Sequence, residues 1–387
     1  MDRSRRDVTR RTYVKTGAAA IAGGGLAGCS SLVGRDGGTT PDGSGDPYTV
    51  EMAPMGTVEF EGVPETWMAY FSTYGDMGIA LGQLDRLSGL VFTENWPIQL
   101  YDTLPGVDVS FDGVQQLMGE SGIDKEVFYE MGCDVHLFDP NHLQRLADGL
   151  SASDFDEIHQ RVGPIVGNSI RRRGQDWHDY RYYSLYEAFE KIADVFQERD
   201  RYEALASVHD SFIEEVRSRL PQEGERPEIG LLSINSDFEN GSFYAYPIGE
   251  GNGKKQYQDL GVQDAFGPHI DGGYAQWDYE QILEVDPDVL VFSYGLSHAS
   301  KTEFEERTAK MRADPVGQRL SAVENDRLYR GGTSYQGPII NLLQTEIAAK
   351  QFYPDEFGEW RGVDALSNAD AQLFDHQRVA DAITGDL

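Results

Sequence analysis

The sequence predicts an α/β protein made of two mainly parallel α/β lobes that are joined by one long helix. Short apolar runs alternate with helical stretches in both halves of the chain, which is the pattern of a parallel sheet covered by helices. Residues 200–220 carry an uninterrupted helical pattern between these halves. Residues 124–138 of the first half are similar to residues 278–292 of the second half. Two similarly built lobes account for all three observations.

The first lobe is expected over residues 48–199. Apolar runs of strand length occur at 67–71, 89–92, 135–138 and 163–166. Residues 72–76 are expected to form the turn into a helix that begins near residue 77. In parallel sheets the loops after the carboxyl ends of the strands build the ligand crevice, so ligand contacts are expected in these loops.

Two helices are expected between the lobes. Residues 184–197 place apolar side chains on one face, and residues 200–220 repeat apolar side chains at spacings of three and four. At 1.5 Å per residue the second helix would be roughly 30 Å long, about the diameter of a small domain. We therefore expect residues 200–220 to bridge the two lobes.

The second lobe is expected over residues 221–387, beginning with a strand at 229–234 and ending in helices. Its segment 278–292 aligns with 124–138 so that both copies predict a short helix, a tight turn and a buried strand. The aligned identities are Asp124 with Asp278, Glu126 with Glu280, Glu130 with Glu284, Asp134 with Asp288, Val135 with Val289 and Phe138 with Phe292. A structural repeat is one interpretation of this match, and chance is the other.

The charge of the chain excludes one class of partner. Asp and Glu number 65 against 33 Lys and Arg, for a formal net charge of -32 at pH 7. Nucleic acid is excluded as a partner because phosphate binding needs a basic surface. The acids recur along the whole chain, which resembles the surfaces of proteins from extreme halophiles, where molar salt screens self-repulsion. We interpret the charge as a halophilic trait that says nothing about the ligand.

The N-terminal region predicts where the protein works. Arg10 and Arg11 are followed by an aromatic, an aliphatic and a lysine, which resembles a twin-arginine (Tat) export signal. Leu-Ala-Gly-Cys, ending at Cys29, resembles the lipobox of lipoproteins. The apolar stretch 17–28 is about 12 residues long, too short for the ~20 residues that span a bilayer.

We therefore expect residues 1–28 to be a signal peptide and residues 29–47 to be a flexible tether lipidated at Cys29. The protein would then be held by its lipid on the extracellular face of the cell membrane. A disordered tail with a chance arginine pair is the alternative. With Cys29 lipidated, Cys133 has no disulfide partner and is expected to be a buried apolar residue.

Four segments of the second half carry a resemblance to a known family. They are 257–266, Asp-Pro-Asp-Val at 286–289, Asp-Pro-Val at 314–316, and 322–329. Together with the lipobox and the two helix-linked lobes, they resemble the periplasmic binding proteins of ABC importers, in the branch that serves ferric siderophores and cobalamin. The resemblance covers roughly residues 48–355 and is clearer in the second half.

This resemblance implies a rigid two-lobed receptor, expected to be a monomer, whose cleft captures a solute and hands it to an ABC permease with a cytoplasmic ATPase. The first-choice cargo is a ferric siderophore of the iron-hydroxamate type. Cobalamin, haem or a free metal ion are the alternatives within the same fold. No cofactor is implied beyond the ligand itself, which would be an Fe(III) chelate.

Candidate ligand contacts are aromatic and polar residues near the ends of the expected strands. Aromatic rings that face each other across a cleft bind flat or partly apolar complexes, and arginine binds carboxylate or hydroxamate oxygens. Any single aromatic is also a plausible core residue. The candidates are Tyr74, Asp76, Trp96, Tyr101 and Arg171 in the first lobe, and Tyr246, Tyr274, Trp277, Tyr294, Tyr335 and Gln336 in the second.

Two further segments have two interpretations each. Residues 171–173 are three arginines, which would either receive an anionic ferric complex or form a solvated run among carboxylates. Residues 249–253 contain three glycines and precede Lys254 and Lys255. They would either let the backbone approach an anion or form a mobile loop.

An enzyme is the alternative to a binding receptor from a different functional class. The chain has no Gly-x-Ser-x-Gly, no His-Glu-x-x-His and no phosphate-binding loop motif, so we expect a binding protein rather than an enzyme. A lipid-anchored extracellular hydrolase with a triad assembled in space is the alternative. A purely structural surface lipoprotein is a third possibility. The eight histidines form no His-x-His or His-x-x-x-His pair, so a chelated metal is expected ahead of a bare one, and convergence of metal ligands in three dimensions is the alternative.

Overall fold

The computed structural model describes residues 46–93, 96–118, 123–147 and 149–387. The predicted export signal, including Arg10, Arg11 and Cys29, and the tether up to residue 45 lie outside the described residues. All described residues belong to one unit of the chain, 44–387. Within them, no helix combines the length with the apolar character that a bilayer crossing requires.

The first lobe is built on a five-stranded sheet in the order β5-β4-β3-β6-β7, with every neighbouring pair parallel. An antiparallel hairpin, β1 (Tyr48–Met52) and β2 (Gly56–Phe60), precedes it and was not predicted. The strands are β3 (Trp67–Ala69), β4 (Leu87–Leu90), β5 (Gln115–Gln116), β6 (Val135–Leu137) and β7 (Ile165–Val166). The helices are α1 (Ser72–Ala80), α2 (Lys125–Met131), α3 (Pro140–Leu146) and α4 (Ala152–Arg161).

The first helix begins earlier than predicted. Residues 72–76, expected to be a turn, form the first turns of α1, which starts at Ser72. Gly75 misled the prediction, because here it serves packing rather than a turn: a Cβ on Gly75 would lie 2.5 Å from the Trp96 ring. Tyr74 and Asp76 are therefore buried helix residues and not loop residues.

The second lobe is built on a mixed sheet in the order β11-β9-β8-β12-β13, with β10 also paired to β8. The pairs that β8 makes with β10 and β12, and β12 with β13, are parallel, whereas β9 is antiparallel to β8 and β11. The strands are β8 (Glu228–Ser233), β9 (Phe243–Tyr246), β10 (Gln263–Asp264), β11 (Ala275–Trp277), β12 (Val289–Ser293) and β13 (Leu328–Arg330). The helices are α7 (Lys255–Asp259), α8 (Tyr279–Val285), α9 (Gly295–His298), α10 (Lys301–Ala313) and α11 (Ser321–Glu324).

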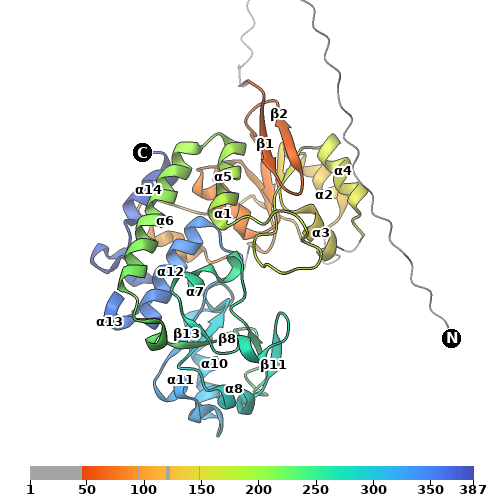
Figure 1. Cartoon of the computed structure of the whole chain (residues 1–387). Coiled ribbons are helices and arrows are strands. Elements are labelled where there is room, and N and C mark those ends of the chain that lie inside the picture. The colour runs from red at the N-terminus through yellow and green to blue at the C-terminus, as the bar shows by residue number, and fades with distance from the viewer. Residues whose placement is uncertain (1–45, 94–95, 119–122, 148) are drawn as a thin grey trace, which may run out of the picture. The chain divides into compact units, whose positions relative to one another are not determined.

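A layer of helices links the two sheets. The long helix expected at 200–220 is α6 (Arg199–Arg219), and α5 (Leu185–Phe196) before it begins with a capping box between Ser184 and Glu187. Figure 1 shows α6 running beside α12 (Pro338–Phe352) and α14 (His376–Thr384), with the short α13 (Pro354–Phe357) between these two in the chain. Every residue of α12 is buried, and this helix contacts α1 of the first lobe and α7 of the second. The predicted fold class is confirmed.

The aligned segments 124–138 and 278–292 do have the same structure. Asp124 and Asp278 cap the helices α2 and α8 by accepting backbone hydrogen bonds, and both helices end in a left-handed residue. Asp134 accepts a hydrogen bond from the backbone N–H of Thr66, just before β3. Asp288 does the same for Glu228, the first residue of β8. The shared aspartates therefore perform the same structural tasks in both lobes.

Cys133 is fully buried, as expected. Burial raises the pKa of its thiol to about 11, so the thiolate is scarce at neutral pH.

Candidate ligand-binding site

One irregular segment that follows the first-lobe sheet reaches the second lobe and builds one wall of a cavity. We call residues 167–183, between β7 and α5, the inter-lobe segment. The backbone N–H groups of Asn252 and Gly253 donate to the carbonyls of Ile170 and Arg171, both at 2.9 Å. The N–H of Arg173 donates back to Glu250 at 3.1 Å. These bonds hold two parts of the chain about 80 residues apart in one arrangement.

The glycines at 249–253 serve this close approach. A Cβ on Gly251 would lie 2.7 Å from the Arg171 carbonyl oxygen, and Gly251 also has a φ of +112°, which favours glycine. A Cβ on Gly253 would lie 3.0 Å from the same oxygen. The glycines therefore let two backbones meet, which neither interpretation of this stretch had anticipated.

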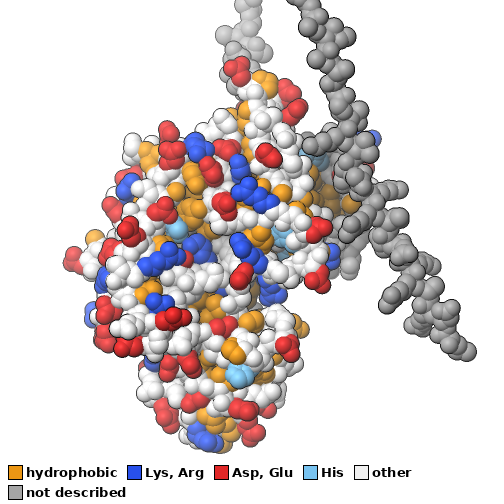
Figure 2. Space-filling view, in the orientation of Figure 1, with side chains coloured by type: hydrophobic (Ala, Val, Ile, Leu, Met, Phe, Trp, Pro, Cys, Tyr) orange, Lys and Arg blue, Asp and Glu red, His pale blue; other side chains and the backbone are white. Residues whose placement is uncertain are grey.

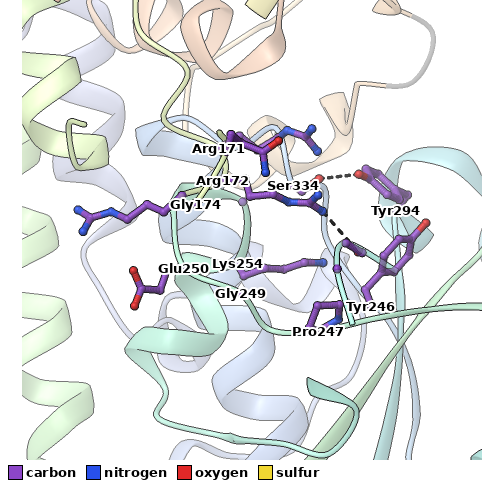
Figure 3. Close-up of a pocket in the computed structure, with 15 residues that line it drawn as sticks. Arg171, Arg172, Gly174, Tyr246, Pro247, Gly249, Glu250, Lys254, Tyr294 and Ser334 are labelled. Atoms are coloured by element: carbon purple, nitrogen blue, oxygen red, sulfur yellow. Dashed lines mark hydrogen bonds between the residues drawn. The ribbon is translucent and has the colours of Figure 1, made fainter. Parts of the chain in front are cut away.

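The cavity has a volume of about 320 Å³ and lies between the inter-lobe segment and the second lobe. Arg171 and Arg172 form one side, while Lys254, Tyr246 and Tyr294 come from the second lobe (Figure 3). The Tyr294 hydroxyl is hydrogen-bonded to the Ser334 hydroxyl, which also faces the cavity. Figure 2 shows lysine and arginine side chains gathered across the middle of this face of an acidic molecule.

Arg171 is held by stacking rather than by an ion pair. Its guanidinium carbon lies 4.7 Å from the centre of the Tyr335 ring, which in turn stacks on Phe71 of the first lobe with centroids 4.7 Å apart. Its Nε is buried and has no hydrogen-bond partner among the described residues. Within the same residues, neither Arg171, Arg172 nor Lys254 forms an ion pair with a carboxylate. The cavity therefore presents three cations that pair with no carboxylate of the described residues.

Lys254 is the second-lobe cation of the cavity. Its Nζ lies 3.3 Å from the Ser293 hydroxyl and 5.4 Å from the centre of the Tyr246 ring. Burial, and then the charges of Arg171 and Arg172, lower the pKa of this amine from 10.5 to about 7. Lys254 thus titrates close to neutral pH.

A smaller cavity of about 200 Å³ extends the basic surface on the first-lobe side. Arg171 and Arg172 line it from the inter-lobe segment, together with His142 and Arg145 of α3 and with Trp177. Burial lowers the pKa of His142 to about 4, so its ring is neutral at pH 7. Sequence reasoning missed His142, Arg145 and Trp177, although His142 follows β6 at its carboxyl end and the strand-end rule would have found it.

The structure brings together part of the predicted site. Arg171, Tyr246 and Tyr294 line the cavity, and Tyr335 stacks on Arg171 beside it. Tyr274 is 60% exposed at the rim, where its ring packs near Tyr246 with centroids 6.5 Å apart.

The other predicted contacts are buried side chains. Tyr74 lines a small cavity together with Arg171 and Tyr335, and Trp96 lines a separate cavity of about 960 Å³. The Tyr74 hydroxyl pairs with the backbone of Asn168 at the start of the inter-lobe segment. Asp76 accepts a hydrogen bond from Tyr101 and two from the first turn of α12. The two tryptophans pack on aromatic rings, Trp277 on Phe266 and Trp96 on Phe111. The Gln336 side chain forms hydrogen bonds with Asn252, Gln256, Asn341 and Gln344. None of these six lines the 320 Å³ cavity.

Two tyrosines of the second lobe allow a matched test of stacking. Tyr246→Ala is expected to weaken binding of an aromatic anionic chelate about fivefold, or about 1 kcal/mol, because a ring in the cavity wall is lost. Tyr274→Ala should change the dissociation constant less than twofold, since that ring is mostly solvated. Fluorescence titration of both variants measures the difference. A larger loss for Tyr274→Ala would move the ligand from the cavity to the rim.

Comparison with known proteins agrees with this architecture. A family model described as periplasmic binding protein matches residues 156–335, slightly less than half of the chain. No curated protein sequence matches. Among solved structures, a periplasmic binding protein from Veillonella parvula has a TM-score of 0.57 at 16% identity, covering 79% of this chain and 97% of that one.

Two further solved structures are similar to the chain. CeuE from Helicobacter pylori, solved with Ni(II) bound, has a TM-score of 0.56 at 10% identity, covering 80% of this chain and 90% of that chain. The iron uptake ABC transporter substrate-binding protein PiuA from Streptococcus pneumoniae has a TM-score of 0.55 at 16% identity, covering 78% and 97%. The described chain has the fold of a two-lobed periplasmic binding protein. Identities this low establish the fold, and the cargo has to be argued from the chemistry of the cavity.

Proposed function

We propose that this protein is the solute-binding receptor of an ABC importer and that it captures an anionic ferric siderophore chelate. The observation that carries the proposal is the cavity in which Arg171, Arg172 and Lys254 meet without a carboxylate partner among the described residues. A partly buried cation without a partner costs free energy, and an anionic ligand that replaces its lost hydration recovers that cost. The fold and the matched family model support the receptor role.

The charge of the cavity ranks the possible cargoes. A tris-catecholate or citrate chelate of Fe(III) carries net negative charge, which the three cations would neutralise. A neutral ferric trihydroxamate, which was the first choice from the sequence, would leave the three positive charges of the cavity uncompensated. Cobalamin would do the same wherever a neutral part of it faced the cavity. A bare metal ion would be repelled by the same cations. Among the described residues, no three His, Cys, Asp or Glu side chains gather as a metal site. We therefore place anionic chelates ahead of hydroxamates.

The remaining parts of the proposal follow from the receptor role. An ABC permease with its ATPase would receive the cargo. The protein would act as a monomer at the extracellular face of the membrane, exported through the Arg10 and Arg11 signal and anchored by lipid at Cys29. The acidic surface would keep it soluble in molar salt.

A panel of chelates tests the proposed cargo. Fluorescence quenching in molar KCl would be titrated with a hexadentate ferric tris-catecholate, ferric citrate, a neutral ferric trihydroxamate and cobalamin. We expect the tris-catecholate to bind at least roughly tenfold more tightly than either neutral ligand, a difference of about 1.4 kcal/mol. Equal or tighter binding of a neutral ligand would contradict the anionic assignment. An absence of saturable binding for all four would contradict the receptor role.

A further inference from the structure

We infer that Lys254 is a specificity-determining residue of the cavity and that capture of an anionic chelate is accompanied by uptake of a proton on its amine. This inference rests on the proposed function and adds to it the way in which pH controls the site. It follows from where the Lys254 side chain lies, which charged groups surround it, and which of them can change charge.

The position of Lys254 is set by the contact between the lobes. It ends the short turn Asn252–Lys254, whose residues Asn252 and Gly253 are hydrogen-bonded to the inter-lobe segment. From there its side chain extends along the cavity toward Tyr246 (Figure 3). The amine contacts the Ser293 hydroxyl at 3.3 Å and lies 5.9 Å from the Tyr257 ring centre. A neutral hydroxyl is therefore its described hydrogen-bond partner.

The charged groups around this amine are mostly positive. Arg171 and Arg172 face it from the inter-lobe segment. The negative charge of Asp264, in β10, raises the pKa of the Lys254 amine. The Asp264 carboxylate nevertheless accepts backbone hydrogen bonds from Ile248 and Gly267 and forms no ion pair with Lys254. Arg173 also lines the cavity, with its guanidinium carbon 4.6 Å from the centre of the Tyr182 ring. Glu250 lines the cavity and points away from the amine (Figure 3). The titratable hydroxyls around the amine belong to Tyr246, Tyr257 and Tyr294.

Among these cations only the lysine can give up its charge near neutral pH. Arginine stays protonated in proteins, whereas an amine that is partly buried beside two arginines loses its proton readily. The low pKa of Lys254 agrees with this expectation. Arg171 and Arg172 would thus keep their charges at pH 8, and at pH 6 the Lys254 ammonium would add its own positive charge to the cavity. An anionic ligand stabilises the ammonium and raises its pKa, so binding draws a proton from solvent.

The protonation of Lys254 sets the direction in which the affinity for an anionic ligand changes with pH. Below about pH 6 the amine is already charged, so affinity for a ligand of fixed charge is independent of pH. Above pH 7 the free protein must first bind a proton, and the affinity for such a ligand falls roughly tenfold between pH 7 and pH 8.5. Proton uptake is about half a proton per ligand at pH 7 and close to one at pH 8.5. A neutral ligand would show neither effect.

Calorimetry in buffers of different ionisation enthalpy tests the inference. The probe is a hexadentate ferric tris-catecholate, whose charge is constant from pH 6.5 to 9. At pH 8.5 we expect the wild-type protein to take up close to one proton on binding. Lys254→Met should take up none and should bind equally at pH 7 and pH 8.5. The matched control is Lys255→Met, because Lys255 is the next residue but pairs with Asp259, and it should behave as the wild type.

The outcomes separate this inference from the proposed function. Binding of the tris-catecholate without proton uptake by the wild type, or uptake that persists in Lys254→Met, would overturn the inference and leave the receptor role standing. No binding at any pH would overturn both. The wild-type measurement alone decides the case if Lys254→Met does not fold.

Discussion

Arg171→Gln is expected to weaken binding of a ferric tris-catecholate roughly thirtyfold, or about 2 kcal/mol. Arg171 lines both the 320 Å³ cavity and its 200 Å³ extension, and no described carboxylate neutralises it. Removal of its charge takes away one of the two arginines, Arg171 and Arg172, that line both cavities. Glutamine retains a stem that packs against Tyr335, so folding should be preserved. Fluorescence titration in molar KCl gives the dissociation constant.

Arg181→Gln is the matched control for this change. Arg181 belongs to the same inter-lobe segment, but it pairs with Glu187 at 3.1 Å and stacks over Tyr183, away from the cavity. Its loss changes the net charge equally and should alter the dissociation constant less than twofold. Equal losses for both variants would mean that only the overall charge of the protein matters. No loss for Arg171→Gln would remove Arg171 from the site.

Asp76→Ala is expected to lower the free energy of unfolding by about 4 kcal/mol. Asp76 is fully buried, and its carboxylate accepts hydrogen bonds from the Tyr101 hydroxyl and from the N–H groups of Ile339 and Ile340. These N–H groups belong to the first turn of α12, which contacts both lobes. Alanine leaves three buried donors without a partner. Urea denaturation measures the loss.

Asp85→Ala is the control, since Asp85 is exposed just beyond α1 and its loss should cost less than about 0.5 kcal/mol. Binding of the tris-catecholate by the folded fraction of Asp76→Ala should stay within twofold of wild type. A variant with normal stability and no binding would instead restore Asp76 to the ligand site, where sequence reasoning had placed it.

The buried carboxyl also predicts a pH dependence of stability. Burial raises the pKa of Asp76 to about 7, against the lowering effect of its hydrogen bonds with Tyr101 and α12. The pKa of Asp76 in the folded protein lies above its unfolded value of 3.8. The stabilising contribution of Asp76 to the free energy of unfolding is therefore complete below about pH 4 and is lost as the pH rises to 7. Asp76→Asn, which cannot ionise, should remove this slope between pH 4 and 7.

The elements of the fold were largely readable from local patterns. The periodicity of residues 200–220 predicted α6, and the aspartates shared by 124–138 and 278–292 marked equivalent helix caps and strand contacts. Such features depend on neighbours only a few residues apart, which is why a single sequence reveals them. The hairpin of β1 and β2 was missed. The early start of α1 was also missed, because Gly75 serves packing there rather than a turn.

The candidate site was readable only in part. The strand-end rule selected Arg171 and Tyr294, which line the cavity, since each follows a strand that has a parallel neighbour. Residue type could not separate Tyr246, in the cavity, from Tyr101, in the core, because tyrosine suits both surroundings. The partner that buries Asp76 lies 263 positions along the chain, far outside any local pattern.

The sequence by itself determined the layered α/β lobes and the helix between them, because periodicity, caps and short motifs are written in consecutive residues. The export address that it indicates stays a prediction. Only the tertiary structure decided that Lys254 meets Arg171 and Arg172. That meeting depends on backbone hydrogen bonds between residues 170–173 and 250–253, two stretches whose approach is set by the packing of both lobes. The charge of the cavity is therefore a property of the docked lobes and not of any single segment.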